Sequence, residues 1–195
     1  MHIIPVIKGL ESEVEVVRNA FEEAKPDRVA ISISKEELEG LRTMPEDFEP
    51  ELSRYEEMYA NELARFGEVA APPPCYVAAL ELADHWGIPL VPVDIDEASY
   101  SDLYCRAVGG TDLFRHSTRT WLLKRKTFRA DTPEEFVLQW DRRVNNLECF
   151  RTIESKRVDA MSEGIRAAAK GSRGLLAVVE LERAGEVAAR LKEKE

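Results

Sequence analysis

The sequence predicts an α/β protein with three layers, in which a mostly parallel four-stranded sheet is flanked by about eight helices. Four short apolar runs rich in β-branched residues recur along the chain, at residues 2–9, 29–33, 88–93 and 175–179. Between them, apolar residues recur every three or four positions, which is typical of helices packed on a sheet. No repeat, low-complexity block or linker divides the chain, so residues 1–195 are expected to form a single domain.

The first apolar run stops at Lys8-Gly9 and is expected to be a buried strand of a parallel sheet, with a ligand-facing loop at its carboxyl end. Ser34 follows the second run and is expected to cap a helix, because Glu36 and Glu37 lie in the first turn after it. The helical pattern covers residues 11–25, 34–42, 51–67, 72–87, 100–110, 131–147, 153–171 and 184–191.

Proline and glycine mark several of these boundaries. Pro72-Pro73-Pro74 opens one helix, because proline is tolerated in a first turn, and Gly87 ends the same helix. Asp131-Thr132-Pro133 combines a capping residue with a first-turn proline and therefore predicts another helix start. The prolines within residues 88–93 favour an edge strand, since proline cannot donate to a neighbouring strand.

The composition limits the classes of function. The net charge of −10 argues against general nucleic-acid binding, because phosphate contacts need clustered basic residues. No apolar run approaches the roughly 20 residues that span a bilayer, so we expect a cytoplasmic protein without a membrane partner. The three cysteines form neither a disulfide framework nor a zinc pattern. The single glutamine and the 33% of charged residues are typical of thermophile proteins.

The common nucleotide-binding and hydrolase motifs are missing from the sequence. It has no G-x-x-x-x-G-K-[ST] loop, no G-x-G-x-x-G turn, no H-E-x-x-H helix and no G-x-S-x-G elbow. The major nucleotide-dependent and serine-hydrolase classes therefore lack their usual support. No cofactor is expected.

Four stretches follow one another in an order and spacing that resemble a known family. They are Lys25-Pro-Asp-Arg-Val-Ala-Ile-Ser-Ile33, the segment from Trp86 to Asp96, Glu154-Ser-Lys-Arg157 with Met161, and Leu176 to Gly185. Over nearly the whole chain this layout resembles the TraB/PrgY family, which is related to the Tiki proteases and more loosely to erythromycin-esterase-like proteins. The resemblance implies the three-layer α/β fold.

The resemblance also implies where a site would be. The family's presumed metal and catalytic residues are two G-x-x-H motifs and a glutamate at the end of the second strand. Pro5-Val-Ile-Lys8, Glu180-Leu-Glu-Arg183 and Ser32 stand at those places here. A protonated lysine cannot ligate a metal ion. We therefore expect the chain to have the family's fold without its metal site, which makes it a candidate pseudoenzyme.

Polar residues at the ends of the four strands are expected to share one rim, and Arg157 to reach it from its helix. The candidate ligand-binding residues are Lys8, Ser32, Ser34, Asp94, Asp96, Arg157, Glu180, Glu182 and Arg183. The leading expectation is non-catalytic binding of a small anionic ligand, or of a protein partner, through Lys8 and Arg183. This requires both cations to be unpaired. The competing structural interpretation is that the charges pair with one another, and Arg157 in particular is expected in a salt bridge.

Two further functions stay open. A hydrolase with a rebuilt polar site would use Lys8, Ser32, Asp94 and Glu180, and it predicts a carboxyl group with a raised pKa beside a cavity. A purely structural subunit of an oligomer needs no ligand. The basic segment from Arg115 to Arg129, with Trp121 and Phe128, suits a solvated helix face, the acidic surface of a second copy, or RNA. A homo-oligomer is expected.

Overall fold

A computed structural model describes residues 1–45, 48, 51–123 and 128–193, and the side chains within this range except those of residues 119–123. Its sheet has four strands, which are β1 (His2–Val6), β2 (Arg28–Ile31), β3 (Leu90–Pro92) and β4 (Leu175–Glu180). Every pairing is parallel, and the strand order is β1-β4-β2-β3. The predicted parallel four-stranded sheet is confirmed, with β3 at an edge as its prolines indicate.

The interpretation of the first strand needs a correction, because β1 lies at the other edge of the sheet. Only Ile4 and Val6 of this strand are buried, whereas all six residues of β4 are buried between β1 and β2. The edge position accommodates Pro5, which has no N–H to donate to a further strand. An apolar run alone does not distinguish a central strand from an edge strand whose neighbours cover one face.

Nine helices surround the sheet in the described residues, compared with about eight expected. They are α1 (Glu13–Ala24), α2 (Lys35–Thr43), α3 (Arg54–Leu63), α4 (Pro74–Trp86), α5 (Glu97–Ala107), α6 (Gly110–Leu123), α7 (Pro133–Val144), α8 (Glu148–Ala169) and α9 (Leu181–Lys192). The additional helix is α6, which contains much of the basic segment. Among these elements, none is long and apolar enough to cross a membrane.

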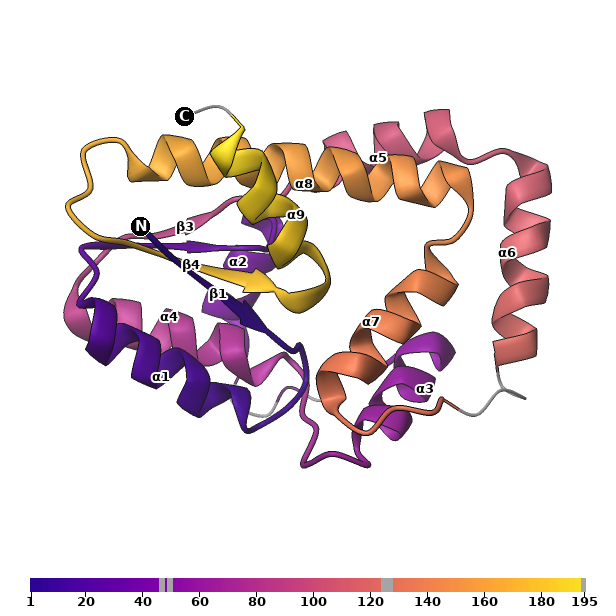
Figure 1. The fold of residues 1–195 in the computed structure, drawn as a ribbon, viewed down its shortest axis with the longest axis horizontal. Helices are drawn as coiled ribbons and strands as arrows, with labels where there is room; N and C mark the ends of the chain where they lie inside the picture. The colour runs from indigo at the N-terminus through magenta and orange to yellow at the C-terminus, as the bar shows by residue number, and fades with distance from the viewer. Residues whose placement is uncertain (46–47, 49–50, 124–127, 194–195) are drawn as a thin grey trace.

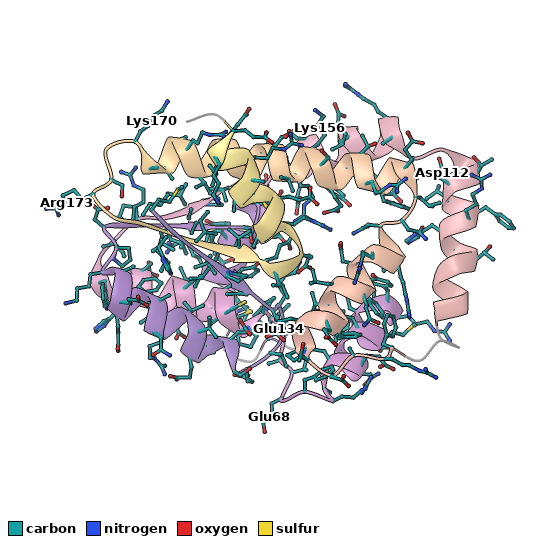
Figure 2. The ribbon with its side chains drawn as sticks, in the orientation of Figure 1. Glu68, Asp112, Glu134, Lys156, Lys170 and Arg173 are labelled. Carbon is teal, nitrogen blue, oxygen red and sulfur yellow. The ribbon has the colours of Figure 1, made fainter. Side chains whose placement is uncertain are left out.

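The helices form one layer on each face of the sheet (Figure 1). On one face, α1 and α4 bury an apolar cluster that includes Phe21 and Val29. On the other face, α8 and α9 bury a cluster around Met161 and Val187. The α/β fold with three layers is therefore confirmed. Charged side chains such as Lys170 point away from the ribbon (Figure 2).

Helices α3 and α7 pack together beyond the carboxyl ends of the strands (Figure 1). Their shared cluster contains fully buried Phe136, together with Leu63, Phe128 and Trp140. Thr132 caps α7 by accepting a hydrogen bond from the N–H of Glu135, as the Asp-Thr-Pro pattern predicts. This packing places an aromatic wall beside the ends of β1 and β4.

Candidate functional site

Two cavities lie at the carboxyl ends of the strands. The first, which we call the Ser32 cavity, has a volume of about 470 Å³. The second, which we call the Trp140 cavity, has a volume of about 640 Å³ and extends between α3 and α7. Lys8, Arg157 and Glu180 line both, so they form the wall between the two cavities. Volumes of this size are typical of small-molecule sites.

Ser32 lines the first cavity. Its Oγ accepts a hydrogen bond from the N–H of Glu180 at 3.0 Å and lies 3.0 Å from the Tyr76 hydroxyl. Burial raises the pKa of Tyr76 well above its usual value, so this phenol stays protonated and cannot act as a base at neutral pH. The contacts of Ser32 therefore join β2 to β4 and do not activate its hydroxyl as a nucleophile.

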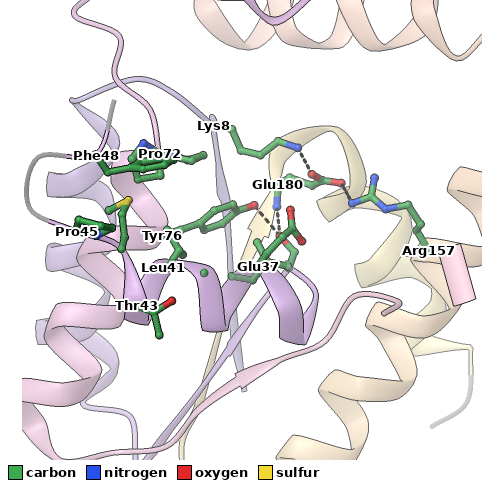
Figure 3. A pocket seen from close by; sticks show the side chains of 15 residues that line it. Lys8, Glu37, Leu41, Thr43, Pro45, Phe48, Pro72, Tyr76, Arg157 and Glu180 are labelled. Atoms are coloured by element: carbon green, nitrogen blue, oxygen red, sulfur yellow. Dashed lines mark hydrogen bonds and ion pairs between the residues drawn. The ribbon is translucent and has the colours of Figure 1, made fainter. Parts of the chain in front are cut away.

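Glu180 is the centre of the charged groups. Its side chain is 1% exposed, and Oε2 pairs with Lys8 while Oε1 lies 3.0 Å from Nη2 of Arg157 (Figure 3). Burial alone would raise the pKa of Glu180, but the charges of Lys8 and Arg157 outweigh this effect and lower it to about 2. Burial likewise opposes the charge of Lys8, yet Glu180 and Glu182 raise its pKa well above the usual value. This pair is therefore ionised at neutral pH.

Both arginines of the candidate set are held by carboxylates. Arg157 donates to Asp94 through Nε at 3.0 Å and to Glu154 through Nη1 at 2.9 Å. Arg183 is 6% exposed; it donates to Glu154 through Nε at 2.6 Å, and both its terminal nitrogens bind Asp141. The predicted salt bridge of Arg157 is confirmed. Buried arginines need such partners because an unpaired buried charge is strongly destabilising.

These pairs bear directly on the expected anionic ligand. That expectation requires Lys8 and Arg183 to be unpaired, and the structure pairs both of them. An anion would have to displace the carboxylate of Glu180, which is buried although Lys8 is partly exposed, or the carboxylates that hold the buried Arg183. Leaving a buried charge without its partner costs about 3–5 kcal/mol. The geometry therefore does not favour an anion at this rim. It agrees with the interpretation that the strand-end charges neutralise one another.

Glu182 has no ion pair shorter than 3.8 Å among the described residues. Its Oε1 lies 3.8 Å from Nζ of Lys8, while its buried Oε2 has no hydrogen-bond partner among the described residues. Burial raises the pKa of Glu182, and the neighbouring charge of Glu180 raises it further. The side chain lines the Trp140 cavity. Glu182 is therefore a carboxyl group with a raised pKa beside a cavity.

Three predicted site residues do not line either cavity. Ser34 caps α2 in a reciprocal capping box with Glu37. Asp96 caps α5 by accepting hydrogen bonds from the N–H and hydroxyl of Ser99, which lower its pKa. The side chain of Asp94 contacts the site through Arg157. Ser34 is thus the helix cap that its sequence context indicates. Asp94 and Asp96 have separate partners and do not form a shared carboxylate pair.

The sequence interpretation missed several residues of the site, notably Tyr76, Trp140, Asp141 and Glu154. Tyr76 and Trp140 occupy apolar positions of α4 and α7, where a core role is the ordinary assumption. Glu154 precedes Arg157 by three positions, a spacing that places the two side chains on one helix face and could have indicated the pair. No local pattern connects Asp141 to Arg183, because these residues meet only in the folded chain.

The basic segment offers little support for RNA binding by stacking. Phe128 is 2% exposed and packs against Phe136 and Trp140, so its ring is not available to a base. The ring of Phe128 contributes to the core, which weakens the RNA interpretation relative to a solvated helix face or contact with a second copy. Arg115 is exposed on α6. The predictions for the side chains of Arg119, Trp121, Lys124, Arg125 and Lys126 lie outside the described residues.

Comparison with protein-family models gives no match to this chain, and comparison with curated proteins gives none either. Within the described part of the chain, no group of three or more histidine, cysteine, aspartate and glutamate side chains is placed to hold a metal ion. The three cysteines are free, and Cys75 is buried. The site is therefore interpreted from its own geometry.

Proposed function

We propose that the protein is a non-catalytic, TraB-like domain that binds a small molecule at the strand-end rim. The observation that carries this proposal is the pair of cavities that share the Lys8, Glu180 and Arg157 wall. Ligands of open α/β sheets bind at the carboxyl ends of the strands, where both cavities lie. Six of the nine candidate residues, including Ser32 and Arg183, line one or both of them. A protein partner at the same rim belongs to the proposal as a second occupant.

The resemblance to the TraB family adds a reason for this location. Lys8, Ser32 and Arg183 occupy the places of the family's presumed metal and catalytic residues, and all three converge on Glu180. In this interpretation, buried ion pairs replace the metal and leave the adjoining cavities open. An anionic ligand remains the least favoured occupant, because each cation already has a carboxylate partner.

A cavity-filling variant tests this proposal. Ala60 of α3 lines the Trp140 cavity, so Ala60→Phe should narrow it, whereas Ala189→Phe places the same ring on an exposed position of α9. A panel of cationic, neutral and anionic small molecules is screened at millimolar concentration by thermal shift and ligand-detected NMR. We expect at least one class to bind the native protein and the Ala189 variant but not the Ala60 variant. Binding of no class, or binding unaffected by Ala60→Phe, would refute the proposal.

The hydrolase alternative has one specific observation in its favour. Glu180 and Glu182 have pKa values shifted in opposite directions, which is the arrangement that general acid–base catalysis uses. The acid in such a site would be Glu182, since Asp94 is bound to Arg157 and Ser32 lacks a base. Turnover of nitrophenyl esters or glycosides that disappears in Glu182→Gln would establish this alternative. The leading proposal expects no turnover above the buffer rate.

Self-association and a cytoplasmic location complete the proposal. Helix α6 exposes Phe114 and Leu113 next to Arg115, while the chain carries a net charge of −10. This helix therefore suits an acidic surface on a second copy of the chain. A purely structural subunit would use the same contact without any ligand. The free cysteines support the cytoplasmic location, because thiols stay reduced in that compartment.

A further inference from the structure

The charged groups at the strand ends are not balanced. Three cations, Lys8, Arg157 and Arg183, face five carboxylates. The five carboxylates are those of Asp94, Asp141, Glu154, Glu180 and Glu182. Asp94, Asp141, Glu154 and Glu180 are each hydrogen-bonded to an arginine or to Lys8, whereas Glu182 has only the 3.8 Å pair with Lys8 among the described residues. Glu182 is therefore one of the two carboxylates in excess.

Two carboxylate oxygens of the cluster, Oε1 of Glu180 and Oε2 of Glu182, are buried without a hydrogen-bond partner among the described residues. Oε1 of Glu180 lies 3.0 Å from Nη2 of Arg157, whereas the nearest cation paired with Glu182 is Lys8, with Nζ 3.8 Å from Oε1. Lys8 is directed instead to Glu180 (Figure 3). A buried oxygen without a donor is destabilising by about 1–3 kcal/mol, and more when it is charged. A ligand that supplies N–H donors and positive charge at this point would remove that penalty.

Aromatic side chains line the same cavity. Tyr55 and Tyr59 lie with ring centroids 5.0 Å and 5.4 Å from that of Trp140, and all three line the Trp140 cavity. Glu182 lines the same cavity as these rings. Burial raises the pKa of the Tyr59 hydroxyl, and the charge of Glu182 raises it further. Aromatic faces attract cations, and aromatic side chains recognise organic ammonium groups in this way. A neighbouring carboxylate adds a charged hydrogen-bond acceptor for the same group.

We propose that the Trp140 cavity binds a small molecule with a protonated amine on an aromatic or otherwise apolar body. Its ammonium group donates to Glu182, and its body packs against Tyr55, Tyr59 and Trp140. This inference rests on the proposed function and specifies the chemistry of the ligand. With the ammonium bound, the five carboxylates still outnumber the cations of the site. The positive charge of Lys8 therefore does not give the site a net positive charge that would repel the ligand.

The amine must compete with a proton for Glu182. Because burial and the charge of Glu180 raise the pKa of Glu182, this group takes up a proton at a higher pH than an ordinary glutamate does. The groups that face it are Lys8 and Glu180 at the strand ends, Arg183 on α9 and Tyr59 on α3. We therefore expect affinity to increase as the pH rises through the pKa of Glu182, and to fall again only when the amine itself loses its proton.

Three probes of nearly equal size test the inference by isothermal titration calorimetry. They are 2-phenylethylamine, 2-phenylethanol and phenylacetate, which carry an ammonium, a hydroxyl and a carboxylate group, respectively, on a short chain attached to a phenyl ring. We expect the amine to bind at least about tenfold more tightly than the alcohol, because a hydrogen bond to a charged group contributes more than a neutral one. Phenylacetate should be the weakest of the three.

Variants connect the binding to Glu182. Glu182→Gln should lower the affinity for the amine by about tenfold or more. Glu186→Gln makes the same change at an exposed position of α9 and should leave it unchanged. Circular dichroism checks the fold, and Glu182→Asp, which keeps the charge, should retain part of the binding. An amine that binds no more tightly than the alcohol, or equally to Glu182→Gln, overturns the inference.

The inference and the proposed function can fail separately. If 2-phenylethanol or phenylacetate binds and Ala60→Phe abolishes that binding while the amine has no advantage, the cavity binds ligands but the amine inference is wrong. If the amine and every other member of the wider panel fail to bind, both are wrong. Amine binding that survives Ala60→Phe places the amine outside the Trp140 cavity and also overturns the inference.

Discussion

Replacing Glu180 by glutamine removes the charge at the centre of the strand-end cluster while almost preserving the shape of the side chain. Glu180 is 1% exposed, and its carboxylate is shared by Lys8, Arg157 and Arg183. The two arginines keep other partners, because Arg157 still binds Asp94 and Arg183 still binds Asp141. In the described part of the chain, Nζ of Lys8 then keeps only Glu182 as an ion-pair partner, at 3.8 Å. The main loss in stability is therefore the Lys8 pair.

The pKa of Glu180 gives the size of this effect. A carboxyl group whose pKa falls from 4.5 to about 2 on folding stabilises the native state by about 3 kcal/mol at neutral pH. This agrees with the low end of the range for breaking a buried ion pair. We therefore expect Glu180→Gln to lower the free energy of unfolding at pH 7 by about 3 kcal/mol.

The same shift predicts a pH dependence. Because the folded pKa is below the unfolded value, the contribution of Glu180 is present in full above about pH 4.5 and is lost as the pH falls toward 2. The difference in unfolding free energy between the native protein and Glu180→Gln should shrink across that window. Urea denaturation followed by circular dichroism at several pH values measures it.

Glu186→Gln is the matched control, since Glu186 is exposed on α9 and should change stability by less than about 0.5 kcal/mol. The reasoning would be refuted if the two glutamine variants had the same stability at pH 7. It would also be refuted if the effect of Glu180→Gln were as large at pH 2 as at pH 7.

Three further predictions concern packing, assembly and metal content. A Cβ at Gly164 of α8 would lie 2.8 Å from Cβ of Val93, so Gly164→Ala should lower the free energy of unfolding by about 1–3 kcal/mol. A Cβ at Gly185 of α9 would have no atom within 4 Å among the described residues, so Gly185→Ala should raise the free energy of unfolding by up to about 1 kcal/mol. Both are measured in the same urea assay. Light scattering of the native protein should give a mass of at least twice 22.1 kDa. Phe114→Ser removes a 75% exposed ring and should shift this mass toward that of the monomer. A monomeric mass for the native protein would contradict self-association. Elemental analysis of the purified protein should find no stoichiometric metal, and one metal ion per chain would show that the strand-end residues were assigned incorrectly.

Much of the fold follows from local patterns in the sequence. The capping box at Ser34 and the proline-led start of α7 confirm that short signals can place helix ends. The position of a strand within the sheet is different, because it depends on which strand lies next to it. Both β1 and β4 read as apolar runs, and only the pairing order shows that β4 is central.

The location of the candidate site was predictable from the order of the strands, but its internal contacts were not. Parallel strands end at one edge, so Lys8, Ser32 and Glu180 could be placed together from the order of elements. The ion pairs that these residues form could not be predicted, because they depend on the helices that pack beside the strand ends. Arg183 binds Asp141 of α7, a residue 42 positions away with no local signal. That contact changes Arg183 from a candidate anion ligand into part of a neutralised cluster.

A crystal structure of the protein soaked with equal concentrations of 2-phenylethylamine and phenylacetate tests the central claim most directly. The claim is that carboxylates already neutralise Lys8 and Arg183, leaving Glu182 as the group that needs a partner. We predict the amine in the Trp140 cavity, with its nitrogen within hydrogen-bond distance of Glu182 and the Lys8–Glu180 pair intact. Phenylacetate bound to Lys8 or Arg183, with Glu180 displaced, would contradict the account.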